Sequence, residues 1–129
     1  MALAVQVVSP ERILWSGDAD MVITRTVDGG EIAFLDGHAP FVGALGIGVT
    51  RIRPAEGDDV RVAVHGGFVE VSDNRVSILS DVAELPDEID VARAEEARTR
   101  AEGRLREAHD ADQEAAMRRA QVRLEAAGG

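Results

Sequence analysis

The sequence contains no cysteine and no lysine, and aromatic residues make up only 3% of its 129 residues. Without cysteine the chain forms no disulfide and no thiolate zinc site, which fits a reducing compartment. The scarcity of aromatic residues means that Val, Ile, Leu and Ala must build the core. Hydrophobic residues reach 45%, enough for one domain, or for one domain with a small appendage. The aromatic residues are Trp15, Phe34, Phe41 and Phe68.

Long apolar runs and excess positive charge are also missing. No apolar run approaches the ~20 residues that span a bilayer, so we expect no direct insertion into a membrane. The apolar start of the chain has no basic leader, and we expect no signal peptide. The formal net charge of −10 disfavours nucleic acid as a partner, because binding to phosphates needs clustered positive charge.

Motifs for catalysis and metal binding are absent as well. The three histidines, His38, His65 and His109, have no paired ligand spacing, so we predict no metal centre. We find no serine nucleophile elbow and no glycine-rich phosphate loop with a lysine. Asp36 and His38 could form an acid–base pair, although a turn with a capping aspartate is the commoner use of such residues. A small enzyme that uses Asp36 and His38 is therefore kept as an alternative function.

Residues 1–86 carry the pattern of short β-strands. Val60, Val62 and Val64 share one face of an alternating segment, and turn-forming residues recur at short intervals. Asp73-Asn74 suits a two-residue hairpin loop, because both residues tolerate positive φ. Together these patterns predict a β-sandwich or barrel. The expected strands lie within residues 3–8, 12–16, 20–27, 31–35, 41–46, 48–53, 60–65, 67–72 and 75–80.

Residues 87–129 carry a helical pattern instead. Pro86 blocks strand continuation, Asp87 or Asp90 can cap a helix, and residues 109–112 interrupt the pattern. The result is an antiparallel two-helix hairpin, here called the helical hairpin. Its apolar stripes are mostly alanine, and each methyl adds only about 0.8 kcal/mol of burial, so we expect it to dock conditionally and to be a moving part. The stripes are Ala94, Ala97, Ala101, Leu105 and Ala108, then Ala116, Ala120, Leu124 and Ala127.

Arginines recur along the helical hairpin, and their spacing allows two interpretations. Arg93 and Arg100 share a helical face, and Arg119 and Arg123 lie four apart on the second helix. Facing arginines could hold phosphates through charge-assisted forks. The alternative is a solvated helix surface with Glu→Arg pairs four residues apart, which spacing alone favours. Such pairs are Glu96–Arg100, Glu102–Arg106 and Glu114–Arg118.

Residues 29–40, Gly-Gly-Glu-Ile-Ala-Phe-Leu-Asp-Gly-His-Ala-Pro, form the most ordered segment of the turn-rich half. Two glycines precede a short apolar strand, and Asp36-Gly37 makes a second turn. Pro40 lacks an amide proton and restricts Ala39, so regular structure cannot continue there. We infer a rigid, shaped tip.

Four segments in order along the chain resemble the epsilon subunit of F-type ATP synthase, called delta in mitochondria. Val-Val-Ser-Pro-Glu at residues 7–11, followed by Trp15, is similar to the family's opening. Residues 30–40, from Gly-Glu-Ile to Gly-His-Ala-Pro, resemble its most recognisable segment. Gly-Gly-Phe-Val-Glu-Val at 66–71 and Ile-Asp-Val-Ala-Arg-Ala at 89–94 resemble its Gly-Gly-Phe strand and the start of its C-terminal hairpin.

The resemblance implies a β-sandwich of about ten short antiparallel strands in residues 1–86 and a helical hairpin in residues 87–129. It implies a non-catalytic rotor subunit whose sandwich binds the gamma subunit and rests on the proton-driven c-ring. The subunit would lie at the cytoplasmic face of the bacterial plasma membrane, as a peripheral part of the complex. The interface candidates are Glu31, Asp36, His38, Gly66, Gly67 and Phe68, with Asp36 standing where the family often has proline.

The resemblance also implies that the helical hairpin can fold on the sandwich or extend towards the alpha and beta catalytic subunits and restrain ATP hydrolysis. In some bacterial members the folded hairpin binds regulatory ATP, and no other cofactor is implied. A stand-alone ATP-sensing module is a further alternative. The residues that match the ATP site are Glu84, Ile89, Asp90, Arg93, Arg100, Arg119 and Arg123.

Overall fold

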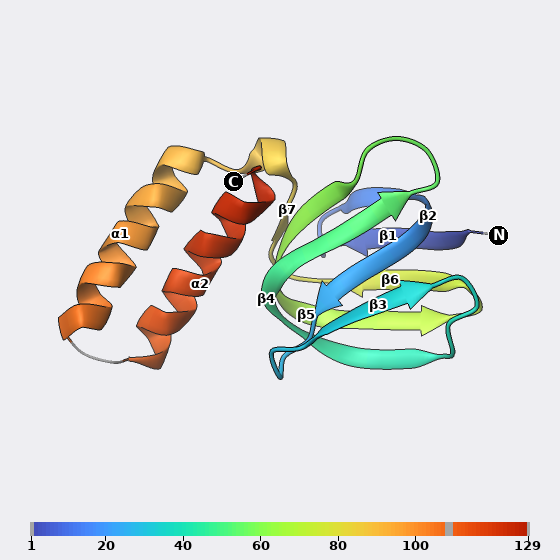
Figure 1. Cartoon of the computed structure of the whole chain (residues 1–129), viewed down its shortest axis with the longest axis horizontal. Helices are drawn as coiled ribbons and strands as arrows, with labels where there is room; N and C mark the ends of the chain where they lie inside the picture. Colours follow the sequence, from blue (N-terminus) through green and yellow to red (C-terminus); the bar gives the residue numbers. More distant parts are fainter. Residues whose placement is uncertain (1, 108–109, 129) are drawn as a thin grey trace.

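The computed structural model describes residues 2–107 and 110–128 and shows a β-sandwich with two helices packed against one end (Figure 1). This confirms the expected fold class. No helix in the described part of the chain is long and apolar enough to cross a membrane. The strands are β1 Leu3–Val8, β2 Ile13–Arg25, β3 Glu31–Leu35, β4 Phe41–Pro54, β5 Val60–Ser72, β6 Arg75–Leu79 and β7 Ala83–Glu84. A 3-10 turn, η1 Pro86–Glu88, leads to α1 Val91–Glu107 and α2 Ala111–Ala126.

The strands form one sheet that closes on itself. Its order is β1-β6-β5-β4-β2-β3, and an additional pairing of β1 with β2 joins the two sides into a sandwich. The neighbours pair antiparallel except β1 and β6, which are parallel. β7 pairs with β5 and so anchors the segment that leads to the helices.

The structure has fewer and longer strands than expected, because three pairs of expected strands are continuous. β2, β4 and β5 each run through a position where glycine suggests a turn. In β5 the glycines bend the strand without ending it: Gly66 and Gly67 have φ values of 87° and 119°. A Cβ on Gly67 would lie 2.1 Å from the Leu79 carbonyl oxygen, so only glycine fits there.

Aliphatic side chains from both sides of the sandwich fill its core. Phe34 is fully buried at 0% exposure and is the largest side chain inside. Strands alternate buried and exposed residues, as β6 shows with Val76 and Ile78 inside and Leu79 outside. The other large, fully buried hydrophobic side chains are Leu3, Val7, Val22, Ile52, Val62, Val64, Val69 and Val71.

The helical hairpin packs through α2, which lies between α1 and the sandwich (Figure 1). Val122 and Ala126 of α2 bury against Ala63 of β5 and Ile89, forming a second, smaller core. The apolar stripes predicted from the sequence include neither Val122 nor Ala126. A single stripe describes one buried face, whereas α2 packs against α1 on one side and against the sandwich on the other. Of those stripes, Ala94, Ala101 and Ala120 are buried, and Ala108 lies outside the described residues.

Aspartates begin both helices. The Asp90 carboxylate accepts from the Arg93 amide at 3.1 Å, and the Asp110 carboxylate accepts from the Asp112 amide at 2.8 Å. Asp90, rather than Asp87, therefore caps α1. Asp87 lies within η1.

Replacing Gly103 by alanine should stabilise the helical hairpin. Gly103 lies inside α1, and an added Cβ meets nothing within 4 Å. Removing a helix-interior glycine gains about 0.5–1 kcal/mol, through higher helix propensity and a less flexible unfolded chain. Thermal unfolding followed by circular dichroism measures the gain. Gly57→Ala is the control and should lower the melting temperature, because Gly57 has a φ of +97°. A lower melting temperature for Gly103→Ala contradicts the placement of Gly103 in the interior of α1.

Candidate functional site

The segment 29–40, predicted as one tip, is divided by β3, because residues 29–30 and residues 36–40 lie at opposite ends of that strand. The β3–β4 turn at residues 36–40 instead joins the β5–β6 turn, and these two turns are called the tip from here on. The Asn74 side chain donates to the Asp36 carboxylate, and its Oδ1 accepts from the Gly37 amide at 2.7 Å. Asp73 and Asn74 have positive φ values of 50° and 61°, which confirms the predicted two-residue loop. The His38 ring stacks edge-on against Phe34 with centroids 5.0 Å apart.

Asp36 and His38 contact different partners and do not form a pair. The Asp36 carboxylate is bound by Asn74, while His38 Nδ1 lies 2.6 Å from the Ala39 carbonyl oxygen. A carboxylate that orients a histidine needs a direct hydrogen bond to the ring. The contacts of both side chains are those of a shaped turn.

Glu31 and His38 do not converge. Glu31 begins β3, while His38 follows the turn after the other end of that strand. The tip thus holds Asp36 and His38, whereas Glu31 lies beside a hollow lined by Arg25 and by Arg118 of α2.

A row of apolar side chains, exposed except for the half-buried Val8, crosses five neighbouring strands. Ile13 of β2 pairs with Val8 of β1, and Val8 pairs with Leu79 of β6. Leu79 pairs with Phe68 of β5, and Phe68 with Ala44 of β4. We call these five residues the apolar row.

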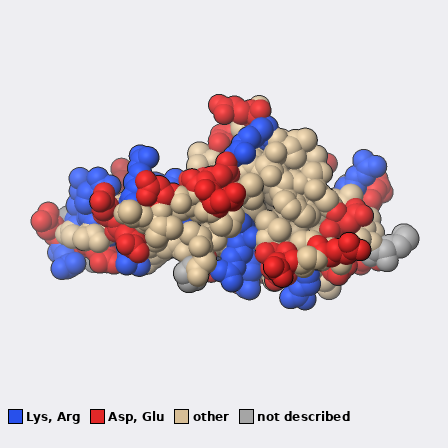
Figure 2. Space-filling model, turned by 90° about the horizontal axis from the view of Figure 1, so that it is seen from above, with Lys and Arg blue, Asp and Glu red and all other residues tan. Residues whose placement is uncertain are grey.

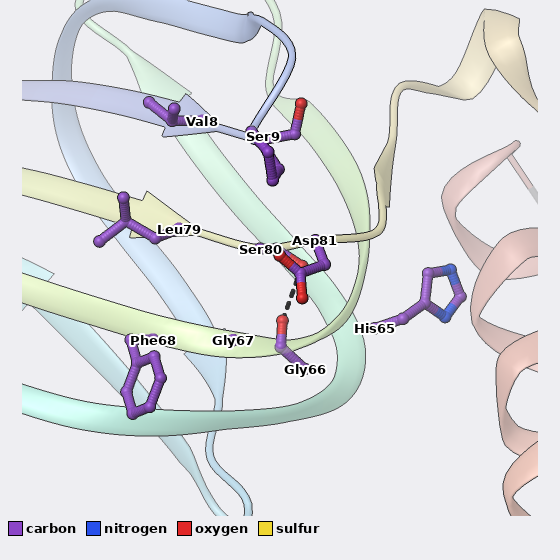
Figure 3. A pocket seen from close by; sticks show the side chains of 10 residues that line it. Val8, Ser9, His65, Gly66, Gly67, Phe68, Leu79, Ser80 and Asp81 are labelled. Carbon is purple, nitrogen blue, oxygen red and sulfur yellow. Dashed lines mark hydrogen bonds between the residues drawn. The ribbon is translucent and has the colours of Figure 1, made fainter.

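The apolar row points away from the core. Ile13, Phe68 and Leu79 are 59%, 58% and 43% exposed, while Ile78 and Val69, beside Leu79 and Phe68, are 0% exposed. Figure 3 shows Val8, Leu79 and Phe68 on successive strands. A contiguous apolar face of this kind marks an interaction surface rather than scattered surface residues.

A hollow of 340 Å³ adjoins the apolar row. Val8, Pro10, Phe68 and Leu79 supply its apolar lining. The Ser80 hydroxyl donates to the Gly66 carbonyl at 2.7 Å, which fixes the bend of β5 at the rim (Figure 3). Gly66 and Gly67 therefore shape the hollow, and Phe68 supplies contact surface.

A second, polar pocket of 290 Å³ lies where α1, α2 and the β7–η1 segment meet. It gathers five of the seven residues that match the ATP site, together with Glu88, Ala94 and Ala97. Ile89 instead packs into the second core with Val122. Arg119 is not in the lining, but its charge acts on His65. The five that gather are Glu84, Asp90, Arg93, Arg100 and Arg123.

Glu84 connects this pocket to the sandwich. Its Oε1 accepts from Arg123 Nε at 2.7 Å and lies 3.0 Å from His65 Nε2. His65 is on β5, Glu84 on β7 and Arg123 on α2, so one carboxylate ties three elements together. Burial lowers the pKa of His65, the hydrogen bond to Glu84 opposes that shift, and the charges of Arg123 and Arg119 add to the lowering.

Glu88 ties the base of the helical hairpin to the β1–β2 turn. It forms an ion pair with Arg12 and accepts from the Leu85 amide at 2.9 Å. The amide, followed by Arg12, lowers the pKa of Glu88. Sequence patterns miss the Arg12–Glu88 and His65–Glu84 contacts, because their partners come from different elements.

Charge is mixed over the surface. In Figure 2, acidic and basic side chains intersperse along the helices, while an area over the sandwich carries neither. The grouped arginines of the polar pocket are therefore local and do not reflect a generally basic hairpin.

Two family models match the chain in succession. The first is described as the beta-sandwich domain of the ATP synthase delta/epsilon chain and matches residues 2–86. The second is described as the long alpha-helix domain of the same chain and matches residues 87–128.

Relatives and solved structures agree with these models. The ATP synthase epsilon chain of Streptomyces griseus is 47% identical over 96% of this chain and 94% of its own length. That of Symbiobacterium thermophilum is 50% identical over 98% of this chain and 93% of its own. The fold matches a chain in the mitochondrial ATP synthase of Euglena gracilis, solved with its F1 part and c-ring, with a TM-score of 0.70 and 23% identity over 96% of this chain and 76% of that one.

Proposed function

The chain belongs to the ATP synthase delta/epsilon family, and from this we propose that its sandwich binds the gamma subunit of the central stalk through the apolar row. It is a non-catalytic subunit of that complex. The apolar row carries the proposal, because strand pairing places its apolar side chains side by side across five strands and Ile13, Phe68 and Leu79 are 43–59% exposed. Aromatic side chains are enriched in the buried centre of interfaces, and Phe68 is the aromatic of this row.

We assign the proposed contacts with the c-ring to the tip, and those with the alpha and beta subunits to the helical hairpin. The tip holds the exposed Asp36 and the half-buried His38 in a turn fixed by contacts with Asn74 and Phe34, which suits a bearing surface against the c-ring. Released from the sandwich, the helical hairpin could reach the alpha and beta catalytic subunits and restrain ATP hydrolysis. These contacts hold the subunit at the cytoplasmic face of the plasma membrane.

Co-purification with the gamma subunit tests the docking proposal. Mixed with purified gamma, the full chain should elute from gel filtration as a one-to-one complex that shows no ATPase activity of its own. Separate elution of the two proteins overturns the proposal and leaves a stand-alone ATP-sensing module as the alternative.

The polar pocket favours a second role, binding of regulatory ATP by the docked helical hairpin. Arg93, Arg100 and Arg123 come from both helices and line one pocket, an arrangement that suits a polyphosphate held by several guanidinium groups. The pocket also holds Glu84, Glu88 and Asp90, whose charges disfavour an anion unless the arginines turn towards it. Calorimetric titration of the chain with ATP tests this role, and the absence of heat at millimolar ATP contradicts it.

A further inference from the structure

His65 is the one buried histidine among the described residues, and its protonation state matters for the docked helical hairpin. Its side chain is only 4% exposed. The adjoining Glu84 oxygen is a hydrogen-bond acceptor when ionised, so Nε2 of a neutral His65 carries the proton. Nδ1 is then bare, and it is buried with no hydrogen-bond partner among the described residues.

The docked structure therefore fits neutral His65 and opposes its protonated form. A proton on Nδ1 would create a buried donor with no acceptor beside it. It would also add a positive charge near Arg119 and Arg123 of α2, although Glu84 of β7 attracts that charge. Figure 3 shows the His65 side chain pointing towards the helices.

We propose that His65 is a proton sensor that releases the helical hairpin from the sandwich when the surroundings become acidic. Release separates α2 from β5, which exposes the imidazole to water and removes Arg119 and Arg123 from its neighbourhood. The proposal rests on the proposed function in one respect, the mobility of the helical hairpin. According to the proposal, a fall in pH shifts the equilibrium from the docked to the extended helical hairpin.

The sign of the effect follows from the burial of His65. Burial, with the two arginines, holds the pKa of His65 below its ordinary value while the hairpin is docked, and Glu84 offsets part of this. An exposed histidine has a pKa of about 6.5. Docking is therefore at full strength above that pH and weakens as the pH falls towards the docked pKa, by up to about tenfold in the docked-to-released ratio per pH unit.

Fluorescence energy transfer on the full chain tests the proposal. The chain has no cysteine, so Asp58→Cys on the sandwich and Arg104→Cys on α1 give two label sites. As the pH falls from 8 to 5.5, transfer should drop with a midpoint below that of an exposed histidine. His65→Gln, which keeps a donor for Glu84 but cannot be protonated, should stay docked over that range. Superimposable profiles for the two proteins overturn the proposal.

A second measurement covers the case in which His65→Gln fails to dock. The imidazole of His65, titrated by NMR in the unlabelled chain, should have a pKa below that of an exposed histidine, and a value at or above it overturns the proposal. Neither measurement uses gamma or nucleotide. A failure here thus leaves the docking of the apolar row intact, and a failure to bind gamma leaves the proton sensor intact.

Discussion

Phe68→Arg abolishes stable binding to the gamma subunit, raising the dissociation constant at least ~100-fold, because a charged side chain replaces the one aromatic of the apolar row. Phe68 has Leu79 on one side and Ala44 on the other, so a guanidinium at this position desolvates among apolar neighbours when a partner covers the row. Isothermal titration of the purified chain with gamma measures the change.

The matched control for Phe68→Arg is Ala55→Arg. Ala55 is exposed in the β4–β5 loop, so the substitution adds the same charge outside the apolar row and should leave the affinity for gamma within about twofold. Phe68 is 58% exposed, and the melting temperature of its variant should change little. Equal affinities for the two variants contradict docking through the apolar row.

The double variant Arg100→Ala/Arg123→Ala should lose at least ~100-fold in affinity for ATP, because a hydrogen bond to a charged group contributes about 1.5–3 kcal/mol. Arg100 comes from α1 and Arg123 from α2, so the pair probes a site that exists only where the two helices meet. Calorimetry with ATP measures the loss. Arg123→Ala also frees Glu84 from one of its two partners, and docking should weaken as well.

Arg104→Ala/Arg106→Ala is the matched control for the nucleotide site. Both arginines are exposed on α1 and lie outside the pocket lining, so their removal should leave ATP affinity nearly unchanged. The pair of transfer labels at positions 58 and 104 reports docking of the Arg100→Ala/Arg123→Ala variant. A docked variant with unaltered ATP affinity identifies the arginines as a solvated helix surface.

Local chemistry made parts of the fold predictable. Asp73-Asn74 forms its two-residue loop because both residues adopt positive φ, a property of the residues themselves. Asp90 caps α1 for a similarly local reason. The bend at Gly66 and Gly67 was not predictable as a bend, because the same glycines also suit a turn that ends a strand.

Most residues of the candidate sites could not be predicted from the sequence, because strand register brings them together from distant segments. Phe68 was a candidate through the family resemblance, but Ile13, Val8, Leu79 and Ala44 join it only through strand pairing. Glu84 contacts His65 and Arg123 and so joins three elements, and one histidine in a strand gives no sequence pattern for this. By contrast, arginine spacing and the resemblance anticipated most of the polar pocket, because helical periodicity is regular.

Thiol protection at the apolar row tests the central claim most directly, since any introduced cysteine is unique in this chain. Ala44→Cys places a thiol in the apolar row, and Ala55→Cys places one in the exposed β4–β5 loop. On binding gamma, alkylation at position 44 should slow at least about tenfold, because a partner that covers the apolar row excludes the reagent together with the water. Alkylation at position 55 should not change. Unchanged alkylation at position 44 in a complex that forms normally contradicts the claim that the apolar row is the docking surface.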